Sequence, residues 1–432
     1  MSRQMKDSGI EWIGEIPETW NTDRLQWHLK EVKESNSPIR TENILSLTIE
    51  SGVIPYEDKG NQGNKAKENY EEYKLAFPDT LVVNSMNVII GAVGISKYFG
   101  CVSPVYYVFN ADGNTDLRYI YYLFTNVGFQ KEMRKYAKGI LEIRLRIAAS
   151  DMLRLQIPNP KKEEQKRIAD YLDQQCAHID AVIEKTKASI EEYKKLKQAV
   201  ITQAVTKGVR GDRPMKDSEL EWAGNIPQEW KISKISRIAS TFSGATPLRS
   251  KESDFFENAD IRWVRTLDLN DWLVEDSSEK ITEDALNNAS CSIMPVNTVC
   301  VAMYGGAGTI GKCGLLTKEC TTNQAVCSII CDDKMLLPQF MLYELLALKK
   351  YWMLFAVGTR KDPNISQEIV GKMKVIIPSI DEQQEIIKYL NQKVAEVDEL
   401  VRRKENFLKS LIEYKKSLIY EYITGKREVE YD

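Results

Sequence analysis

Histidine is scarce in this chain, and long apolar runs are missing. The 432 residues include only two histidines, His28 and His178, so histidine-based acid–base catalysis is poorly provided for. No apolar run approaches the roughly 18 residues that a membrane span needs, and no charged-then-apolar signal segment opens the chain. We therefore expect a cytoplasmic protein that does not rely on histidine chemistry.

The spacing of cysteine and glycine gives no sign of a metal or cofactor site. Six of the eight cysteines lie between Cys291 and Cys331, but no C-x-x-C pair occurs, whereas structural zinc normally requires close ligand pairs. Residues 306–311 (GAGTIG) match the G-x-G-x-x-G pattern of dinucleotide sites, yet the chain continues KCGLLTKECTTN instead of entering a helix. The related GAVGISK at residues 91–97 favours a turn between two strands in both places. We expect reduced thiols, and neither a metal nor a cofactor, in this chain.

Neither sign of charge dominates the composition. There are 59 Lys+Arg against 62 Asp+Glu, a formal net charge of −3, which argues against a uniformly basic nucleic-acid surface. With 43% hydrophobic and 28% charged residues, the chain has the composition of an ordinary globular protein. At about 150 residues per domain, its length allows two to three domains.

The sequence contains a long internal repeat. Residues 5–20 (MKDSGIEWIGEIPETW) and 215–230 (MKDSELEWAGNIPQEW) share ten of sixteen positions at an offset of 210. A second block repeats at an offset of 218, where residues 164–180 match 382–398 in their Glu-Gln, Ile, Tyr-Leu and Asp positions. Each half therefore has a tryptophan-rich entry, a variable middle and a long charged helix. A period this long indicates two tandem copies of a domain-plus-helix unit, not a solenoid.

The two variable middles are predicted to be mixed α/β. Residues 80–83 and 102–109 in the first, and 298–301 and 325–330 in the second, are β-branched or aromatic-rich runs that suit strands. Helical stretches follow at 117–136 and 337–355. Each middle closes on Ile-Pro, at 157–158 and 377–378, where proline ends regular structure before the long helix.

The two long helices have the heptad character of a coiled coil. One seven-residue series comprises Leu172, Ile179, Thr186, Tyr193 and Val200, with Leu390, Val397, Lys404, Leu411 and Leu418. The other comprises Ile168, Gln175, Val182, Ser189 and Leu196, with Ile386, Lys393, Leu400, Phe407 and Tyr414. The matched lengths favour pairing of the two helices with each other, although each could instead pack on its own domain. The candidate residues for this pairing and for partner docking are Leu172, Ile179, Val182, Tyr193, Leu390, Val397, Leu400 and Leu411.

These elements predict an α+β protein of two tandem mixed α/β domains joined by two long helices. The helices are expected to form an antiparallel coiled coil. The expected boundaries are 1–160 for the first domain, 161–210 for the first helix, 211–380 for the second domain, and 381–432 for the second helix and C-terminal tail.

The chain resembles the DNA-specificity subunit of type I restriction–modification enzymes along nearly all of its length. The residues that carry the resemblance are SGATPLRS (243–250), IRWVRTLDL (261–269), VAMYGGAGTIGKCG (301–314), TTNQAV (321–326) and RLRI (144–147), together with the IP…EQ…I…YL entries to both helices. The first middle departs from this pattern, because SGATP and TNQA have no literal counterpart there.

The resemblance implies a non-catalytic reader of double-stranded DNA with pseudo-two-fold symmetry within one chain. Each recognition domain would read one half of a split, asymmetric target, and the helices would set the unread gap. Two modification subunits would dock on the helical region and methylate adenine N6 with S-adenosylmethionine, and restriction subunits could join to cut DNA with ATP and Mg²⁺. The chain itself would hold no cofactor. A coiled-coil structural adaptor that reads no DNA sequence is the alternative.

The candidate DNA-binding residues are local basic clusters and two amides. Arginine suits guanine edges, and Asn or Gln suits adenine, although Asn323 and Gln324 could instead be buried residues that bond backbone. Arg144 and Arg146, like Arg360 and Lys361, follow a glycine in equivalent places of the two halves. The full candidate set is Lys138, Arg144, Arg146, Arg249, Arg265, Asn323, Gln324, Arg360 and Lys361.

Overall fold

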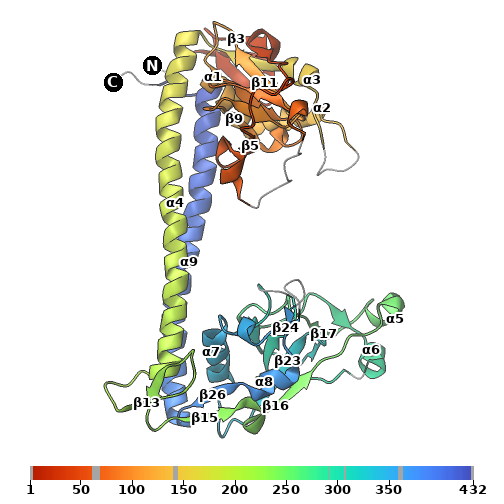
Figure 1. The fold of residues 1–432 in the computed structure, drawn as a ribbon, viewed down its shortest axis with the longest axis vertical. Coiled ribbons are helices and arrows are strands. Elements are labelled where there is room, and N and C mark those ends of the chain that lie inside the picture. Colours follow the sequence, from red (N-terminus) through yellow and green to blue (C-terminus); the bar gives the residue numbers. More distant parts are fainter. Residues whose placement is uncertain are drawn as a thin grey trace. The chain divides into compact units, whose positions relative to one another are not determined.

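The chain divides into two compact units. The computed structural model describes residues 3–60, 69–139, 145–289, 291–305, 308–358 and 363–429. Unit 1 comprises Met1–Lys187 with Asn406–Asp432, and unit 2 comprises Ala188–Glu405. Both long helices, α4 (Lys162–Lys207) and α9 (Ile380–Ile423), contribute one end to each unit (Figure 1). Among the described residues, no helix is long and apolar enough to cross a membrane.

Unit 1 is built around a four-stranded antiparallel sheet in the order β4-β11-β8-β9. All four residues of the inner strand β8 (Leu81–Asn84) are buried, as expected for a Leu-Val-Val run in the middle of a sheet. Around this sheet lie four two-stranded pairs. The remaining strands of unit 1 are β1 (Met5–Ile10) with β2 (Gly14–Pro17), β3 (Asn21–Arg24) with β12 (Gln156–Asn159), β5 (Leu45–Thr48) with β6 (Gly52–Pro55), β7 (Lys74–Ala76) with β10 (Gly100–Val102), and, in the main sheet, β4 (Leu29–Glu31), β9 (Val93–Ile95) and β11 (Tyr106–Ala111).

The helices of unit 1 are shorter than the sequence predicts. The expected helix at 117–136 is two helices, α1 (Leu117–Thr125) and α2 (Val127–Tyr136). Asn126 breaks them apart, because its extended backbone ends α1 while its side chain accepts hydrogen bonds from the N–H groups of Gly128 and Phe129 and caps α2. A third short helix, α3 (Ala149–Leu153), precedes β12. The expected strand at 102–109 is likewise two strands, β10 and β11.

Unit 2 has a five-stranded sheet in the order β16-β23-β20-β21-β18 and a three-stranded sheet in the order β19-β17-β22. The strands expected at 298–301 and 325–330 are its buried strands β20 (Val299–Ala302) and β23 (Val326–Cys331). The other strands are β13 (Met215–Asp217) with β14 (Asn225–Pro227), β15 (Lys231–Lys234) with β26 (Lys374–Ile377), β24 (Val357–Gly358) with β25 (Pro363–Asn364), and β16 (Ala239–Ser243), β17 (Ile261–Val264), β18 (Trp272–Val274), β19 (Lys280–Ile281), β21 (Cys313–Leu316) and β22 (Thr321–Thr322).

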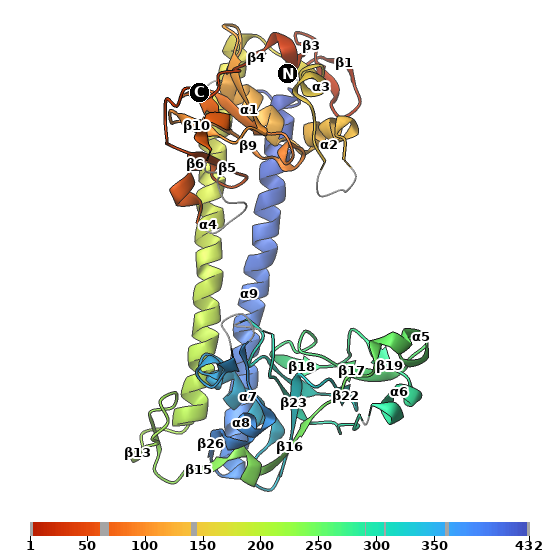
Figure 2. The ribbon, with the colours of Figure 1, turned by 45° about the vertical axis from the view of Figure 1, so that its right-hand side comes forward.

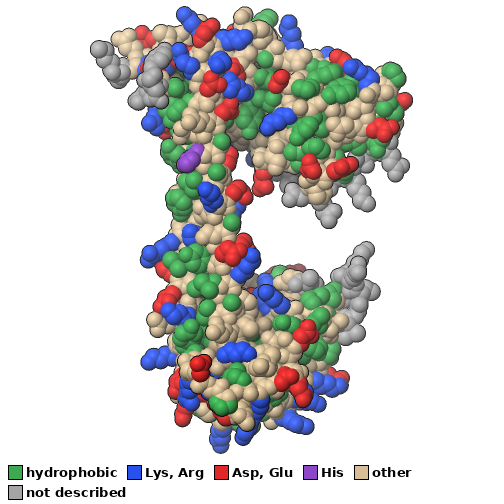
Figure 3. All heavy atoms as spheres, turned by 60° about the vertical axis from the view of Figure 1, so that its left-hand side comes forward, with side chains coloured by type: hydrophobic (Ala, Val, Ile, Leu, Met, Phe, Trp, Pro, Cys, Tyr) green, Lys and Arg blue, Asp and Glu red, His purple; other side chains and the backbone are tan. Residues whose placement is uncertain are grey.

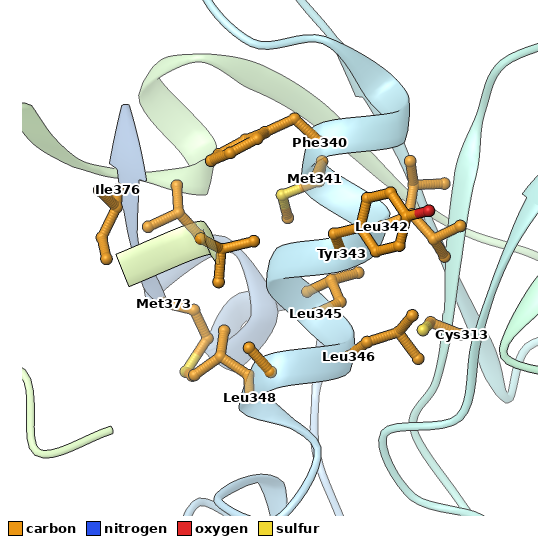
Figure 4. Close-up of a cluster of buried hydrophobic side chains, with 14 of the residues drawn as sticks. Cys313, Phe340, Met341, Leu342, Tyr343, Leu345, Leu346, Leu348, Met373 and Ile376 are labelled. Atoms are coloured by element: carbon orange, nitrogen blue, oxygen red, sulfur yellow. The ribbon is translucent and has the colours of Figure 1, made fainter. Parts of the chain in front are cut away.

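The core of unit 2 surrounds α7 (Pro338–Leu348), which is buried from Phe340 onward. Figure 4 shows side chains of α7 pointing toward Cys313 of β21 on one side and toward Met373 and Ile376 on the other. Burial raises the pKa of the core thiol Cys327 to about 12, so this thiol stays protonated and inert. Three short helices complete the unit: α5 (Glu252–Phe255), α6 (Glu283–Asn288) and α8 (Gln367–Lys372).

The glycine motif lies in turns, as its repetition suggests. Gly91 lies between the antiparallel strands β8 and β9, and Gly311 lies between β20 and β21. Both have positive φ values, 92° and 78°, which glycine adopts without strain. In the described residues a strand follows each of these glycines, β9 from Val93 and β21 from Cys313, whereas the dinucleotide motif continues into a helix.

The two long helices pair antiparallel within each unit (Figure 2). In unit 1, the rings of Tyr171 and Tyr422 are 4.5 Å apart, and Asp180 accepts a hydrogen bond from Lys415 at 2.7 Å. In unit 2, Lys197 donates to Asp398 at 2.8 Å. Residue numbers rise along one helix as they fall along the other, so the α+β class with an antiparallel coiled coil is confirmed.

The residues that fill the helix–helix seam correct part of the heptad prediction. The series that begins at Leu172 and Leu390 lies in the seam, with its members buried or half-buried. The second predicted series is wrong in register beyond its first members: Ile168 and Ile386 are buried in the cores of their units, but Leu196, Leu400, Phe407 and Tyr414 are exposed. The second buried series stands one position later along each helix, and its members are Cys176, Ile183, Ile190 and Lys197 on α4, with Val394, Val401, Leu408, Lys415 and Tyr422 on α9. Both the predicted and the observed series place apolar residues at alternating three- and four-residue spacing. The spacing alone therefore did not distinguish them.

Candidate nucleic-acid interface

Two parallel strands of unit 2 place candidate residues at one edge. Trp263 and Val264 of β17 lie opposite Thr321 and Thr322 of β22 in a parallel pair. The pairing continues past the strand ends, since the backbone N–H of Asn323 donates to the carbonyl of Val264 at 3.0 Å. Residues that follow parallel strands emerge at the same edge, so Arg265 stands beside Asn323.

One carboxylate joins two of the predicted arginines. Glu279 accepts a hydrogen bond from Arg249 Nη2 at 2.5 Å and another from Arg265 Nη1 at 2.7 Å. Arg265 Nη2 also donates to Ser278 Oγ at 2.9 Å. Two guanidinium groups that share one carboxylate keep one net positive charge and N–H groups in a fixed orientation. The sequence did not indicate Glu279, which folding alone brings to these arginines.

Aromatic rings support the same two guanidinium groups. Arg249 Cζ lies 4.4 Å from the centroid of Phe256 and 5.5 Å from that of the buried Trp263. Arg265 Cζ lies 5.8 Å from the same tryptophan ring. Stacking on an aromatic face restricts an arginine side chain before any ligand arrives. The arrangement suits recognition of a planar acceptor pair, such as a guanine edge or a phosphate.

The two predicted amides of unit 2 differ in their surroundings. The side-chain oxygen of the half-buried Asn323 accepts the backbone N–H of Ala325 at 3.2 Å, so it has the backbone-bonding role that the sequence left open. The side chain of Gln324 is exposed. Its backbone carbonyl accepts from Ser243 Oγ at 3.3 Å, which ties the end of β16 to the edge that carries Arg265.

In unit 1, the structure brings Lys138 and Arg146 together. Their backbones form an antiparallel bridge, with N–H···O distances of 2.8 and 2.9 Å, and both residues are exposed. Lys74, which the sequence did not indicate, is near enough for Arg146 to affect its titration: burial lowers the pKa of Lys74, Glu31 opposes that shift, and the positive charge of Arg146 adds to it. Unit 1 therefore has a local basic cluster. The candidates Arg144, Arg360 and Lys361 lie outside the described residues.

Charges elsewhere are interspersed. On the face in Figure 3, Lys and Arg side chains alternate with Asp and Glu side chains. Lys135, which belongs to the basic stretch before Lys138, illustrates this pattern, because its ammonium pairs with Glu11 and Glu132, each at 2.8 Å. The candidate surfaces are thus local clusters, and no uniformly basic coat covers the face shown.

The helix candidates differ in burial. Leu172, Ile179, Leu390 and Val397 are buried in the helical pairs of their units. Tyr193, Leu411 and Val182 are half-buried, and the side chain of Leu400 is 40% exposed.

Comparison with known proteins identifies the fold and the family. A family model described as the type I restriction modification DNA specificity domain matches residues 22–192 and again 227–410. The chain belongs to this family. Its two matches are the two repeats, so it is a type I restriction–modification specificity subunit with two DNA-recognition domains.

One named relative and two solved structures match this chain over nearly its whole length. The type I restriction enzyme MjaVIII specificity subunit of Methanocaldococcus jannaschii is 24% identical over 430 residues, which cover 96% of this chain and 94% of the relative. A chain from a structure entitled "Structural basis underlying complex assembly and conformational transition of the type I R-M system" superposes with a TM-score of 0.72 at 13% identity, covering 95% of this chain and 99% of that one. The HsdS subunit from Thermoanaerobacter tengcongensis superposes with a TM-score of 0.50 at 14% identity, covering 95% and 98%. At these identities the two structures support the fold alone.

Proposed function

We propose that each unit of this specificity subunit reads one half of a bipartite, asymmetric double-stranded DNA target. In unit 2, the reading residue is Arg265, oriented by Glu279, with Gln324 at the same edge; Arg249 holds the other oxygen of that carboxylate. In unit 1, they are Lys138 and Arg146, with Lys74 adding positive charge. Two readers with different side chains suit two different half-sites, whereas identical readers would suit a palindrome.

The observation that carries this proposal is the Arg249–Glu279–Arg265 cluster at the end of two parallel strands. The Arg265 guanidinium in this cluster is oriented by the carboxylate and by the Trp263 ring, and its side chain is 26% exposed. Arginine held in this way pairs with O6 and N7 of guanine. Phosphate contacts then come from the surrounding lysines and arginines, which position the duplex without selecting sequence.

We further propose that the paired helices dock two adenine-N6 methyltransferase subunits. Exposed and half-buried apolar residues of the second predicted heptad series form a flank beside the seam in each unit. In unit 1, this flank comprises Val182, Phe407 and Tyr414, and in unit 2 it comprises Leu196 and Leu400. In an antiparallel pair these positions of the two helices face the same side, and exposed apolar side chains in one stripe mark a binding surface.

In this proposal the chain is a reader without catalytic activity of its own. The methyltransferase partners bind S-adenosylmethionine and flip the target adenine out of the duplex. Restriction subunits, which use ATP and Mg²⁺, are a further partner in systems that also cut DNA. The eight cysteines are free thiols, six of them buried, and contribute to packing.

Substitution of Arg265 tests sequence reading in unit 2. We expect Arg265→Ala, in complex with the modification subunits, to bind its target about 1–3 kcal/mol more weakly and to accept other bases at one position of one half-site. Arg262→Ala is the matched control, because Arg262 lies on the same strand β17 and pairs with Asp276. Binding titrations and genomic methylation mapping measure both effects. Unchanged specificity, or equal binding of random duplexes by the wild type, would instead support the structural adaptor.

The helix flank is tested by a charge on its apolar side chains. We expect Phe407→Asp to reduce co-purification of the modification subunits at least tenfold. Ser410→Asp adds the same charge to an exposed position of the same helix and should leave assembly unchanged. Equal assembly of the two variants would place the docking surface elsewhere.

A further inference from the structure

A short motif is repeated in the two units at equivalent places. Ser37-Pro38-Ile39-Arg40 follows β4 in unit 1, and Thr246-Pro247-Leu248-Arg249 follows β16 in unit 2, at an offset of 209. Both carry a hydroxyl residue, a proline, a branched aliphatic residue and an arginine. The SGATP segment of unit 2 therefore has a counterpart in unit 1, displaced by one position, which literal matching of the sequence missed.

In unit 1, the arginine of this motif stacks on two aromatic rings. Arg40 Cζ lies 5.7 Å from the centroid of Phe77 and 5.8 Å from that of Phe99, and the two rings are 5.4 Å apart. Arg40 Nη1 donates to Glu34 at 2.6 Å. The side chain is thus held by two rings and a carboxylate while remaining about half-exposed.

In unit 2, Arg249 has the same kind of support from unrelated segments. Its two rings are Phe256 and Trp263, and its carboxylate is Glu279. The rings of unit 1 come from the ends of β7 and β10, whereas those of unit 2 come from β17 and the turn after α5. The rings and the carboxylate that hold the arginine come from different segments in the two units. In both units, however, the arginine contacts two aromatic rings and one glutamate.

The aliphatic residue of each motif faces solvent. Ile39 is 49% exposed and Leu248 is 65% exposed. Phe99, whose ring contacts Arg40, is 39% exposed. A phosphate contact needs positive charge alone, but here each arginine of the motif stands next to exposed apolar surface. Arginine and aromatic side chains beside an apolar anchor are instead typical of protein–protein interfaces.

The duplication indicates which protein binds. Residues that read different half-sites should differ between the two units, whereas a feature retained in both serves something the two halves share. Under the proposed function, on which this step rests, the shared protein is the modification subunit, present in two copies. A single-copy partner would not need the surface twice.

We propose that Ile39–Arg40 in unit 1 and Leu248–Arg249 in unit 2 each dock one modification subunit. The partner would supply an apolar pocket for the aliphatic side chain and hydrogen-bond acceptors for the guanidinium N–H groups that the glutamate leaves available. The helix flank and this motif then hold the same partner at two points. The second point places its active site beside the half-site that the same unit reads.

The experiment uses the full chain with the modification subunit. Ile39→Asp and Leu248→Asp are compared with Ile90→Asp and Ile293→Asp, which alter exposed aliphatic residues of the same units outside the motif. Native mass spectrometry without DNA counts the modification subunits bound, and strand-resolved sequencing measures methylation of each half-site. Thermal unfolding of each free variant checks that it is folded, and Arg40→Gln and Arg249→Gln provide milder changes of the same surface.

Each motif variant is expected to bind one modification subunit under conditions where the wild type binds two. Its affinity for the lost subunit should fall at least tenfold, and methylation should be lost from only one half-site, a different one for each variant. Retention of both modification subunits with weaker DNA binding would overturn the proposal and assign the motif to DNA. Behaviour identical to that of the control variants would also overturn it. If the wild type itself bound no modification subunit, the proposed function would fail, whatever the variants did.

Discussion

In unit 1, the side chain of Gln165 accepts the backbone N–H of Asp116 at the start of α1, and in unit 2 Gln383 does the same for Leu337 before α7. Tyr122 donates to Asp173 on α4, and Tyr343 donates to Asn391 on α9, both at 2.7 Å. These contacts join each domain to its long helix. The units therefore share the way in which a domain is attached to its helix, and they differ at the surfaces proposed to read DNA. Attachment of a domain to its helix and the proposed recognition of DNA therefore depend on separate residues.

The two units differ at two buried positions, and the residues at these positions change together. Glu344 of α7 is fully buried and accepts the backbone N–H of Ile376. The β12 and β26 registers place Pro158 of unit 1 at the position of Ile376, and α1 places Leu123 at the position of Glu344. Pro158 has no backbone N–H group to donate, so unit 1 needs no hydrogen-bond acceptor here and has Leu123 at that position. Unit 2 has a donor in its core and supplies an acceptor for it.

The largest effect is expected when the acceptor is introduced where there is no donor. Leu123→Glu would bury a carboxyl group without a partner and should lower the free energy of unfolding of unit 1 by about 3–5 kcal/mol. The reciprocal change, Glu344→Leu, leaves one N–H unpaired and should cost only about 1–3 kcal/mol. Chemical denaturation of the two variants checks the difference. Equal losses would mean that the pairing with Ile376 does not explain Glu344.

A pH-dependent effect should be confined to unit 2. Burial raises the pKa of Glu344 well above its usual value, and the hydrogen bond from Ile376 only partly opposes this shift. The unfolded chain loses this proton near its ordinary pKa of about 4.3. Folding therefore requires proton uptake above that pH, and stability falls as pH rises toward the folded-state pKa, by at most about 1.4 kcal/mol for each pH unit. Glu344→Gln should remove this part of the slope in urea titrations at several pH values, whereas Leu123→Met should not alter it.

The smallest expected effect is a difference in stability between substitutions of two buried tryptophans, Trp20 and Trp230. Trp20 and Trp230 are equally buried, but only Trp230 donates its Nε1–H to a carboxylate, that of Glu382, at 2.8 Å. Within the described residues, the Nε1–H of Trp20 has no acceptor. Trp230→Phe should therefore cost about 1–2 kcal/mol more than Trp20→Phe, measured by thermal unfolding. A larger loss for Trp20→Phe would contradict this assignment.

The sequence predicted the elements of this fold better than their boundaries. Repeats, long helices and buried strands follow from identity, heptad spacing and β-branched runs, and all were found. The Ile-Pro pairs at 157–158 and 377–378 were predicted to end regular structure; β26 does end before Pro378, but Pro158 lies inside β12 and is equivalent to Ile376 in strand pairing. The break at Asn126 was also missed, since one capping side chain outweighed a continuous helical pattern.

The candidate reading surfaces were predicted only in part. The predicted arginines of unit 2 come together, but Glu279 was not indicated, because it contacts Arg249 from 30 positions away along the chain. Lys74 was missed for the same reason, since its proximity to Arg146 depends on the sheet. A contact made by tertiary pairing has no local spacing in the sequence. The repeated Ser/Thr-Pro-Ile/Leu-Arg motif, by contrast, was readable once an offset of 209 was allowed.

The last turn of α9 completes the first domain. Tyr119 in the core of unit 1 donates to the carbonyl of Ile423 at 2.9 Å, and Gly425 packs against the ring of Trp20. Unit 1 therefore lacks a buried part of its core until the last turn of α9 has been synthesised. A chain that terminates early would expose that apolar surface to chaperones and proteases. Folding of unit 1 thus waits for residues that follow unit 2 in the chain.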